Sequence, residues 1–561
     1  MRSAKLILSI SLLAFTLSWS LWYVFAGYGN PMDPFYWLYK YQAMESGWMS
    51  VGTILTGGAL VRLFGAQLLP LRLAGWLTIV AAIVLPYCAL LNREQRLNNL
   101  HWLALAFGLM GYGAFQEFSP GTLTVLLLSA IWVSATKSPI LTAILAGLAV
   151  SIRFPNILVL LVLLPLWRKK SLWLVPITAA SAGLVYLLGY LFVTPAYMDP
   201  SMGSHGIMAM VSKLWENGAK VLGYALLWLG VWAVYQVGGK FEIKNQRFAI
   251  INPYMPLIAG IVMGAFLVYY ITFVPAIHQW YNYDVTYMIS VGCIVLALLV
   301  SFQSPITNHQ SPITNNQSPI TNHQLPITNN QSPTTNHQSP ITNHQLPIGV
   351  AILFVATLGT DTAWLKLFPA ALCLFAIAAS RMEKEALRRY WFPVLLGLTI
   401  AVMMRFSINC IGDYNLRYCT VRSSAAPYEH IFIREVDEAQ LKQYKADYDS
   451  LQSPITNHQS QILSLGQDMH RMRSVTGCQA ARYNEFWSNI FDSVYTVKYR
   501  EIIEAERPIV FCSYSPRFKT KPTYKDRHSA LEEMLRSEGY REIDRSKYRY
   551  MIYIPDDEKI Q

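Results

Sequence analysis

Charged residues are scarce in this chain. They make up 14% of its 561 residues, whereas hydrophobic residues make up 53%. A soluble globular protein usually has about 25% charged residues. The shortage is confined to residues 1–406, which hold 11 of the 33 acids and 23 of the 45 bases. This uneven distribution excludes a single soluble globule, a disordered chain and a domain on a single anchor. It predicts a large membrane domain followed by a soluble domain.

Long basic runs are also missing. The longest is Arg168-Lys169-Lys170, and the other bases lie between apolar segments. This distribution is typical of the positive-inside rule rather than of nucleic-acid binding. The first residues, Met1–Lys5, precede an apolar run in the way that a signal peptide begins. Because no clean small-residue cleavage site follows, we interpret this run as a retained first helix.

Apolar segments long enough to cross a bilayer recur through residues 1–406. A transmembrane helix needs about 20 mostly apolar residues. Thirteen candidates have this character: 5–27, 71–92, 101–116, 119–136, 138–152, 155–167, 171–194, 219–238, 254–275, 286–302, 346–360, 364–380 and 390–406. With the N-terminus inside, the inner connections carry 15 of the 23 bases, and the odd number of helices places the tail outside the cytoplasm. Twelve helices with the tail inside is the alternative.

These features predict a polytopic α-helical membrane protein of the plasma membrane with a C-terminal extracytoplasmic α/β domain. The predicted parts are a first transmembrane part at 1–302 with an outer loop at 28–70, a cytoplasmic repeat loop at 303–345, the last helices at 346–406, and the soluble domain at 407–561. In the soluble domain, the sequence predicts a polar helix over Glu438–Leu451 and strands over 507–512 and 547–554, with a helix that begins near Ser529.

Cysteines are few, and no Cys-x-x-Cys spacing occurs. Four of the seven lie in the tail, at Cys410, Cys419, Cys478 and Cys512. An even number of cysteines in a non-cytoplasmic domain favours disulfides, with three possible pairings. The alternative is four free thiols in a cytosolic tail.

Residues 304–345 consist of six copies of the heptapeptide Ser-Pro-Ile-Thr-Asn-His-Gln with small variations, and a further copy stands at 453–459. Tandem copies of the DNA heptamer CCAATCA encode this peptide, and the variants differ by single bases. Proline at every seventh position prevents regular helix or sheet. We therefore interpret the repeat as a translated DNA repeat in permissive loops, and we exclude its histidines from the search for a site.

Ionisable residues close to apolar segments are candidates for function, because they are costly there. Asp33 is the only acid among the first 44 residues and follows the first helix. An Asp before Pro is also common in turns, which is the structural alternative. Glu117 lies on the predicted outer side as well. His278 and Asp284 are further candidates on that side, although an interfacial aromatic belt explains the surroundings of His278 better.

The layout resembles that of the GT-C glycosyltransferases, which are polytopic enzymes that use polyprenyl-phosphate-linked sugars. Protein mannosyltransferases and lipid A aminoarabinose transferases belong to this family. The segments Asp33-Pro34-Phe35-Tyr36 and Ala43-Met44-Glu45-Ser46-Gly47 look like its first outer loop. Leu63-Phe64-Gly65 with Leu71-Arg72-Leu73, and Ala146–Pro155, are similar to its later landmarks. Pro34 departs from the family, because a second acid usually stands there.

The resemblance implies transfer of a sugar from a polyprenyl-phosphate donor to a hydroxyl group of a glycan, lipid or protein, with inversion, on the outer face of the membrane. Asp33, alone or with Glu117, would then accept the proton of the hydroxyl group. Four outer bases are candidates for binding the donor phosphate: Lys40, Arg62, Arg72 and Arg153. Each of them is equally well explained as an interfacial residue whose charge reaches toward water. No metal ligand set is evident, and a divalent metal ion stays open as a cofactor.

Two other classes of function remain. A transporter or flippase of lipid-linked or small solutes would show internal two-fold repetition and broken helices in matching halves, and neither is evident. A catalytically inactive membrane scaffold is the third hypothesis. Besides the donor and acceptor, the partners expected from the sequence are membrane lipids and no nucleic acid.

Overall fold

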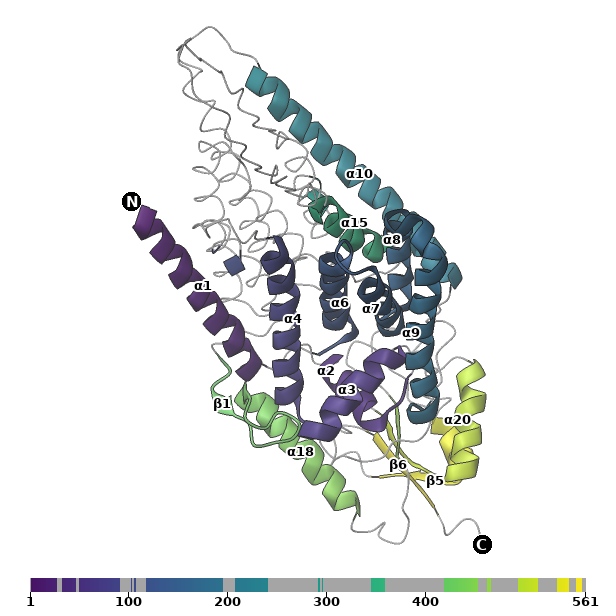
Figure 1. Ribbon diagram of the computed structural model, residues 1–561. Helices are drawn as coiled ribbons and strands as arrows, with labels where there is room; N and C mark the ends of the chain where they lie inside the picture. The colour runs from purple at the N-terminus through teal and green to yellow at the C-terminus, as the bar shows by residue number, and fades with distance from the viewer. Residues whose placement is uncertain are drawn as a thin grey trace, which may run out of the picture.

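The computed structural model describes residues 2–27, 33–46, 50–90, 118–194, 207–240, 345–358, 418–452, 462–465, 493–512, 532–543 and 551–556, with isolated positions at 102, 105–106, 291–292 and 295. The chain is mostly helical in these residues and has a small mixed region at its C-terminal end (Figure 1). This confirms the coarse fold prediction. The number of membrane-spanning helices stays a prediction.

In the described residues, the helical region contains eight α-helices and two short 3₁₀ helices besides the helices of the loop 28–70. These are α1 (Arg2–Phe25), α4 (Leu68–Leu90), α6 (Pro120–Ser134), α7 (Pro139–Ile152), η1 (Phe154–Val159), α8 (Leu160–Trp167), η2 (Arg168–Lys170), α9 (Ser171–Phe192), α10 (Ile207–Lys240) and α15 (Gln345–Leu358). Within the described residues, two helical stretches are long and apolar enough to cross a membrane, Leu68–Pro86 and Phe154–Phe192. The predicted segments 254–275, 364–380 and 390–406 lie outside the described residues, and so does the repeat loop 303–345 except for Gln345, which begins α15.

The predicted outer loop 28–70 contains two further helices, α2 (Asp33–Ala43) and α3 (Val51–Phe64). In α3, glycines permit close packing against neighbouring helices. A methyl group at Gly57 would overlap the Tyr41 ring of α2, and one at Gly52 would lie 2.7 Å from the Ser151 hydroxyl of α7. The loop is therefore packed tightly onto the helical region.

In its described residues, the tail forms two small sheets and two long helices. Strands β1 (Val421–Arg422) and β2 (Phe432–Ile433) make an antiparallel hairpin, followed by α18 (Glu435–Gln452). The other sheet has the order β3-β4-β6-β5, with β3 (Ile462–Leu465) parallel to β4 (Ile509–Cys512) and the rest antiparallel. The other two strands of this sheet are β5 (Tyr540–Glu542) and β6 (Met551–Pro555). Helix α20 (Ser493–Glu506) precedes β4 in the chain. The predicted polar helix and the strands at 507–512 and 547–554 are confirmed, with shifted ends.

The tail packs against the same end of the helical region as the α2–α3 loop does (Figure 1). The backbone N–H of Gly27, after α1, donates to the Phe432 carbonyl at 2.8 Å. The N–H of Leu68, at the start of α4, donates to the Pro427 carbonyl at 2.9 Å. One hydrophobic cluster includes Trp37 and Tyr41 of the loop together with tail side chains such as Tyr428, Ile433 and Ile552. The tail and the loop therefore share a core.

Candidate functional site

Helix α2 begins at Asp33, and Lys40 in its last turn forms a buried ion pair with Glu45, just beyond the end of the helix. Asp33 forms part of the helix backbone, while its side chain lies outside the described atoms. The Lys40 ammonium lies 3.1 Å from the Glu45 carboxylate, with only 1% of the Lys40 side chain and 12% of the Glu45 side chain exposed. The Tyr39 hydroxyl donates to the same carboxylate oxygen at 3.3 Å. Glu45 thus neutralises the charge of Lys40 within the loop.

Tyr41 joins this loop to the segment that carries Glu117. Its hydroxyl donates to the Phe118 carbonyl at 3.0 Å, and the two rings meet edge to face with centroids 6.4 Å apart. Phe118 is buried directly before the Ser119 cap of α6. Glu117 itself lies outside the described residues. Its neighbour nevertheless contacts α2, which brings the two predicted catalytic segments to one end of the helices.

Helix α3 joins the loop to the segment that carries Arg153. The Thr53 hydroxyl donates to the Ile152 carbonyl at 3.2 Å, at the point where α7 ends. Arg153 is half-buried and follows α7 in an extended conformation before η1 begins. The residue that was predicted to bind phosphate therefore lies next to the N-terminal part of α3.

The end of α9 closes the same region. The N–H of Thr194 donates to the Met44 carbonyl at 2.8 Å, and the N–H of Ser46 donates to the Thr194 carbonyl at 3.0 Å. These two hydrogen bonds fix the chain directly around Glu45. The Lys40–Glu45 pair is consequently held by backbone contacts to Thr194, which follows α9 and is far away in the sequence.

Arg72 has a different environment from the one expected of a phosphate ligand. Its side chain is only 3% exposed. Its Nη1 donates to the Gly27 carbonyl at 2.8 Å, and its guanidinium lies over the Tyr428 ring at 5.6 Å. These contacts join α1, α4 and the tail, so Arg72 positions the tail against the helices.

Arg62 lies apart from these contacts, exposed in the last turn of α3. His278 and Asp284 lie outside the described residues. The structure thus brings together Lys40 and the segments of Glu117 and Arg153, and it places Arg62 elsewhere.

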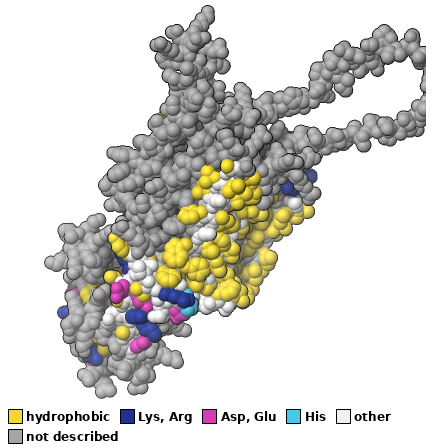
Figure 2. All heavy atoms as spheres, turned by 90° about the vertical axis from the view of Figure 1, so that its left-hand side faces the viewer, with side chains coloured by type: hydrophobic (Ala, Val, Ile, Leu, Met, Phe, Trp, Pro, Cys, Tyr) yellow, Lys and Arg dark blue, Asp and Glu magenta, His cyan; other side chains and the backbone are white. Residues whose placement is uncertain are grey.

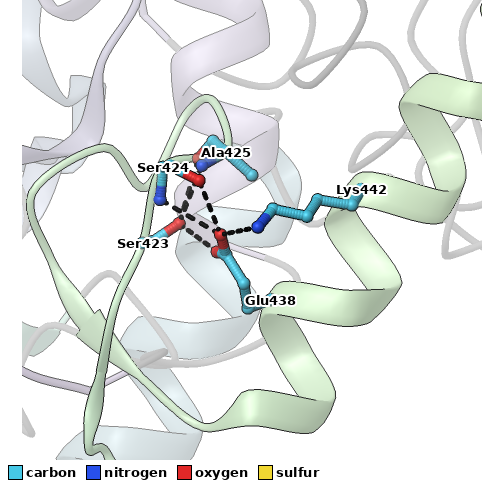
Figure 3. Close-up of polar contacts among 5 residues, drawn as sticks. All are labelled: Ser423, Ser424, Ala425, Glu438 and Lys442. Carbon is cyan, nitrogen blue, oxygen red and sulfur yellow. Dashed lines mark hydrogen bonds and ion pairs between the residues drawn. The ribbon is translucent and has the colours of Figure 1, made fainter.

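A polar cluster in the tail, which the sequence did not predict, orders the loop that carries Tyr428 (Figure 3). The Glu438 carboxylate, on the first turn of α18, accepts hydrogen bonds from the hydroxyls of Ser423 and Ser424 and from the N–H of Ser424 at 3.1 Å. Lys442, one turn later, lies 3.0 Å from the same carboxylate. Consecutive serines before an acidic helix start were the only sequence signal.

These contacts shift the acidity of Glu438. Burial alone would raise the pKa of its carboxyl group. The hydrogen bonds from Ser423, Lys442 and Ser424 together outweigh burial and hold the pKa below its ordinary value. The ionised form is therefore the one that the folded tail stabilises.

Cys419 carries a free, buried thiol near the start of the hairpin. Burial, reinforced by the charge of Asp437, raises its pKa. The expectation of a disulfide is therefore wrong for Cys419, because this buried side chain packs in the core as a small hydrophobic group. Cys410 and Cys478 lie outside the described residues, and so does the side chain of Cys512.

In the part of the chain that the structure describes, no three His, Cys, Asp or Glu side chains lie close enough together to share a metal ion. Comparison of the chain with known protein families and with characterised proteins found no match.

Proposed function

We propose that the protein is a membrane glycosyltransferase of the GT-C type, which transfers a sugar from a polyprenyl-phosphate donor to a hydroxyl acceptor on the outer face of the plasma membrane. One observation carries the proposal. The loop that begins at Asp33 is packed through Tyr41 and Thr53 against the two chain segments that hold Glu117 and Arg153. A carboxylate and a cation from different segments can therefore approach one donor.

Exposed apolar surface supports insertion into a membrane. Only 17% of the most apolar part of Phe154–Phe192 is buried within the chain. Leu172, Tyr190 and Leu191 of α9 are 85%, 86% and 62% exposed. Apolar side chains exposed to this degree are stabilised by lipid, since transfer out of water is favourable by about 25 cal/mol per Å².

The orientation of the helices supports a catalytic site on the outer side of the membrane. The end of α1 at Phe25, the start of α4 at Leu68 and the end of α7 at Ile152 all meet the α2–α3 loop or the tail. Lys137 and the Arg168–Lys170 turn lie at the opposite ends of α6 and α8. By the positive-inside rule, the end with the basic turn faces the cytoplasm. The loop and the tail then face outward.

The proposed chemistry is a direct displacement at the anomeric carbon. The acceptor oxygen forms the new bond to this carbon while its proton passes to the Asp33 carboxylate. The bond between the carbon and the phosphate oxygen breaks, and polyprenyl phosphate leaves with the electron pair. A single displacement inverts the anomeric centre. Of the four predicted bases, we assign Arg153 to the phosphate, because the Thr53–Ile152 hydrogen bond holds its segment against the loop that begins at Asp33.

A transfer assay with a panel of polyprenyl-phosphate sugars tests the proposal. Asp33→Asn should reduce turnover by about 10²–10⁴-fold, the usual contribution of general-base catalysis, while donor binding is retained. Gln42→Asn, at an exposed position of the same helix, is the matched control and should keep full activity. Full activity of the Asp33 variant would contradict the mechanism. Solute flux in proteoliposomes without sugar transfer would favour a transporter instead.

A further inference from the structure

The surface beside α1 changes abruptly from apolar to charged where the helix meets the tail. Along α1, five large apolar side chains are 43–64% exposed, namely Ile7, Leu8, Ile10, Phe15 and Trp22. Figure 2 shows a band of hydrophobic side chains on this side of the molecule that ends at a group of basic, acidic and histidine side chains. Such a boundary is expected where a bilayer core gives way to its headgroup layer.

The hairpin β1–β2 lies at this boundary. The Trp22 ring, near the end of α1, stacks on the Phe432 ring of β2 with centroids 5.6 Å apart. A parallel bridge also joins Ala26 to Phe432. Tryptophan prefers the interface between hydrocarbon and headgroups. The stack thus places the hairpin at the level of the headgroups if α1 spans the membrane.

Arg422 of β1 is exposed and makes no ion pair with any residue that the structure describes. Other tail bases are paired: Arg434 with Asp437, Lys442 with Glu438, Lys445 with Asp449 and Arg536 with Glu532. The guanidinium of Arg422 instead contacts the Nδ1 of His430 at 3.2 Å. An unpaired guanidinium retains several N–H donors in a planar fork that matches phosphate oxygens.

The contact also sets the chemistry of His430, which is exposed. A guanidinium can only donate, so Nδ1 accepts and the neutral imidazole carries its proton on Nε2. Nε2–H is then a further donor beside the guanidinium. Glu429, the half-buried neighbour of His430, is the one acidic residue among residues 421–433. Its negative charge would repel an anion that binds to Arg422 and His430.

We infer that the hairpin β1–β2 binds the phosphate of anionic bilayer lipids through Arg422 and His430, and so anchors the tail to the outer leaflet beside α1. This inference rests on the proposed insertion of α1 in the membrane and not on the proposed transferase activity. An inactive Asp33→Asn protein leaves it untouched.

Hydrogen–deuterium exchange of the full-length protein in nanodiscs tests the inference. The amides of residues 421–433 are compared in phosphatidylcholine alone and in a mixture with phosphatidylglycerol. A basic side chain near an anionic surface contributes about 1 kcal/mol, so phosphatidylglycerol should slow exchange of the hairpin about fivefold. A third sample, phosphatidylcholine nanodiscs with inorganic phosphate, separates lipid headgroups from free phosphate.

Three variants separate lipid binding from simple stabilisation of the hairpin. Arg422→Gln should abolish most of the lipid effect, whereas Arg422→Lys, which keeps the charge, should retain it. Lys445→Gln, at an exposed tail base that is paired with Asp449, is the matched control and should behave as the wild type.

Several results would overturn the inference. Equal exchange in both lipids would do so, as would an undiminished lipid effect in Arg422→Gln. If inorganic phosphate slowed exchange as strongly as phosphatidylglycerol, the site would be one for soluble anions. If Arg422→Gln accelerated exchange equally in both lipids, Arg422 would stabilise the hairpin without binding lipid.

Discussion

The α2–α3 loop and the tail each bury a carboxylate, but they satisfy it differently. Glu45 of the loop is neutralised by a lysine that is itself buried. Glu438 of the tail is held by two serines, one backbone N–H and a lysine that is 60% exposed. A buried ion pair depends on both partners, because removing one leaves an uncompensated charge. A carboxylate with several neutral donors loses only part of its stabilisation when one donor is removed.

The difference is consistent with the surroundings of the two regions. Helices around the loop expose apolar side chains over much of their length, whereas α18 exposes charged residues that form ion pairs along its surface. Water can assist Glu438 through the exposed Lys442, but it has little access to Lys40. We therefore expect substitutions in the loop to cost more than comparable substitutions in the tail.

The largest effect on stability is expected for Lys40→Met. It leaves the Glu45 carboxylate buried without its cation, which costs about 3–5 kcal/mol of unfolding free energy. The double variant Lys40→Met/Glu45→Gln should recover most of this loss. Thermal unfolding in detergent measures both. Lys213→Met is the matched control, because its pair with Glu216 is also short at 2.8 Å but exposed. We expect it to change stability by about 0–1 kcal/mol. Equal losses of unfolding free energy in Lys40→Met and Lys213→Met would contradict the proposed difference between a buried and an exposed ion pair.

A smaller effect is expected for Arg72→Ala, which loses the hydrogen bond to Gly27 and the contact with Tyr428. Hydrogen bonds to charged groups contribute about 1.5–3 kcal/mol, so the tail should detach more readily from the helices. The rate at which a protease cleaves the tail from the purified protein reports this change. Arg62→Ala, at an exposed position, is the control and should leave the rate unchanged. If cleavage stays slow in Arg72→Ala while donor binding weakens, Arg72 is a phosphate ligand and not a positioning residue.

The smallest effect is expected from acid. The pKa of Glu438 is held below its ordinary value of about 4.3, so its contribution to tail stability is complete above that pH. The contribution is lost as the pH falls through the lower pKa of the folded state. Proteolytic sensitivity of the Ser423–Ala425 loop should therefore rise below about pH 4. Glu438→Gln should be sensitive at neutral pH and should lose this part of the pH dependence. An identical acid response in wild type and variant would assign the effect to other carboxyl groups.

Part of this structure was predictable from the sequence. Apolar runs predicted α1, α4, α6, α7 and α9, because burial or insertion of such runs favours helix regardless of distant partners. Alternation of side chains predicted β6, although its ends were displaced. The sequence predicted that Asp33 follows the first helix. It did not predict that Asp33 begins α2, since Asp-Pro indicates a turn as well as a helix start.

The contacts between distant segments were not predictable. Neither hydropathy nor spacing indicates that Arg72 meets Tyr428, or that Tyr41 meets Phe118, because both contacts depend on tertiary packing. The sequence shows that Lys40 and Arg72 are basic, but it does not indicate which groups they contact. Lys40 forms an ion pair with Glu45, and Arg72 donates to Gly27 at the junction with the tail, while phosphate binding by either residue stays a prediction.

We expect the loop with Asp33 and the tail to lie together on the outer side of the membrane. Labelling of intact cells with a membrane-impermeant maleimide tests it most directly, using single cysteines in a cysteine-free background. Gln42→Cys in α2, Ala446→Cys in α18 and Lys169→Cys in η2 probe exposed positions of the loop, the tail and the basic turn. We expect labelling of the first two in intact cells and of Lys169→Cys only after permeabilisation. Labelling of Ala446→Cys only after permeabilisation would place the tail inside and contradict the account.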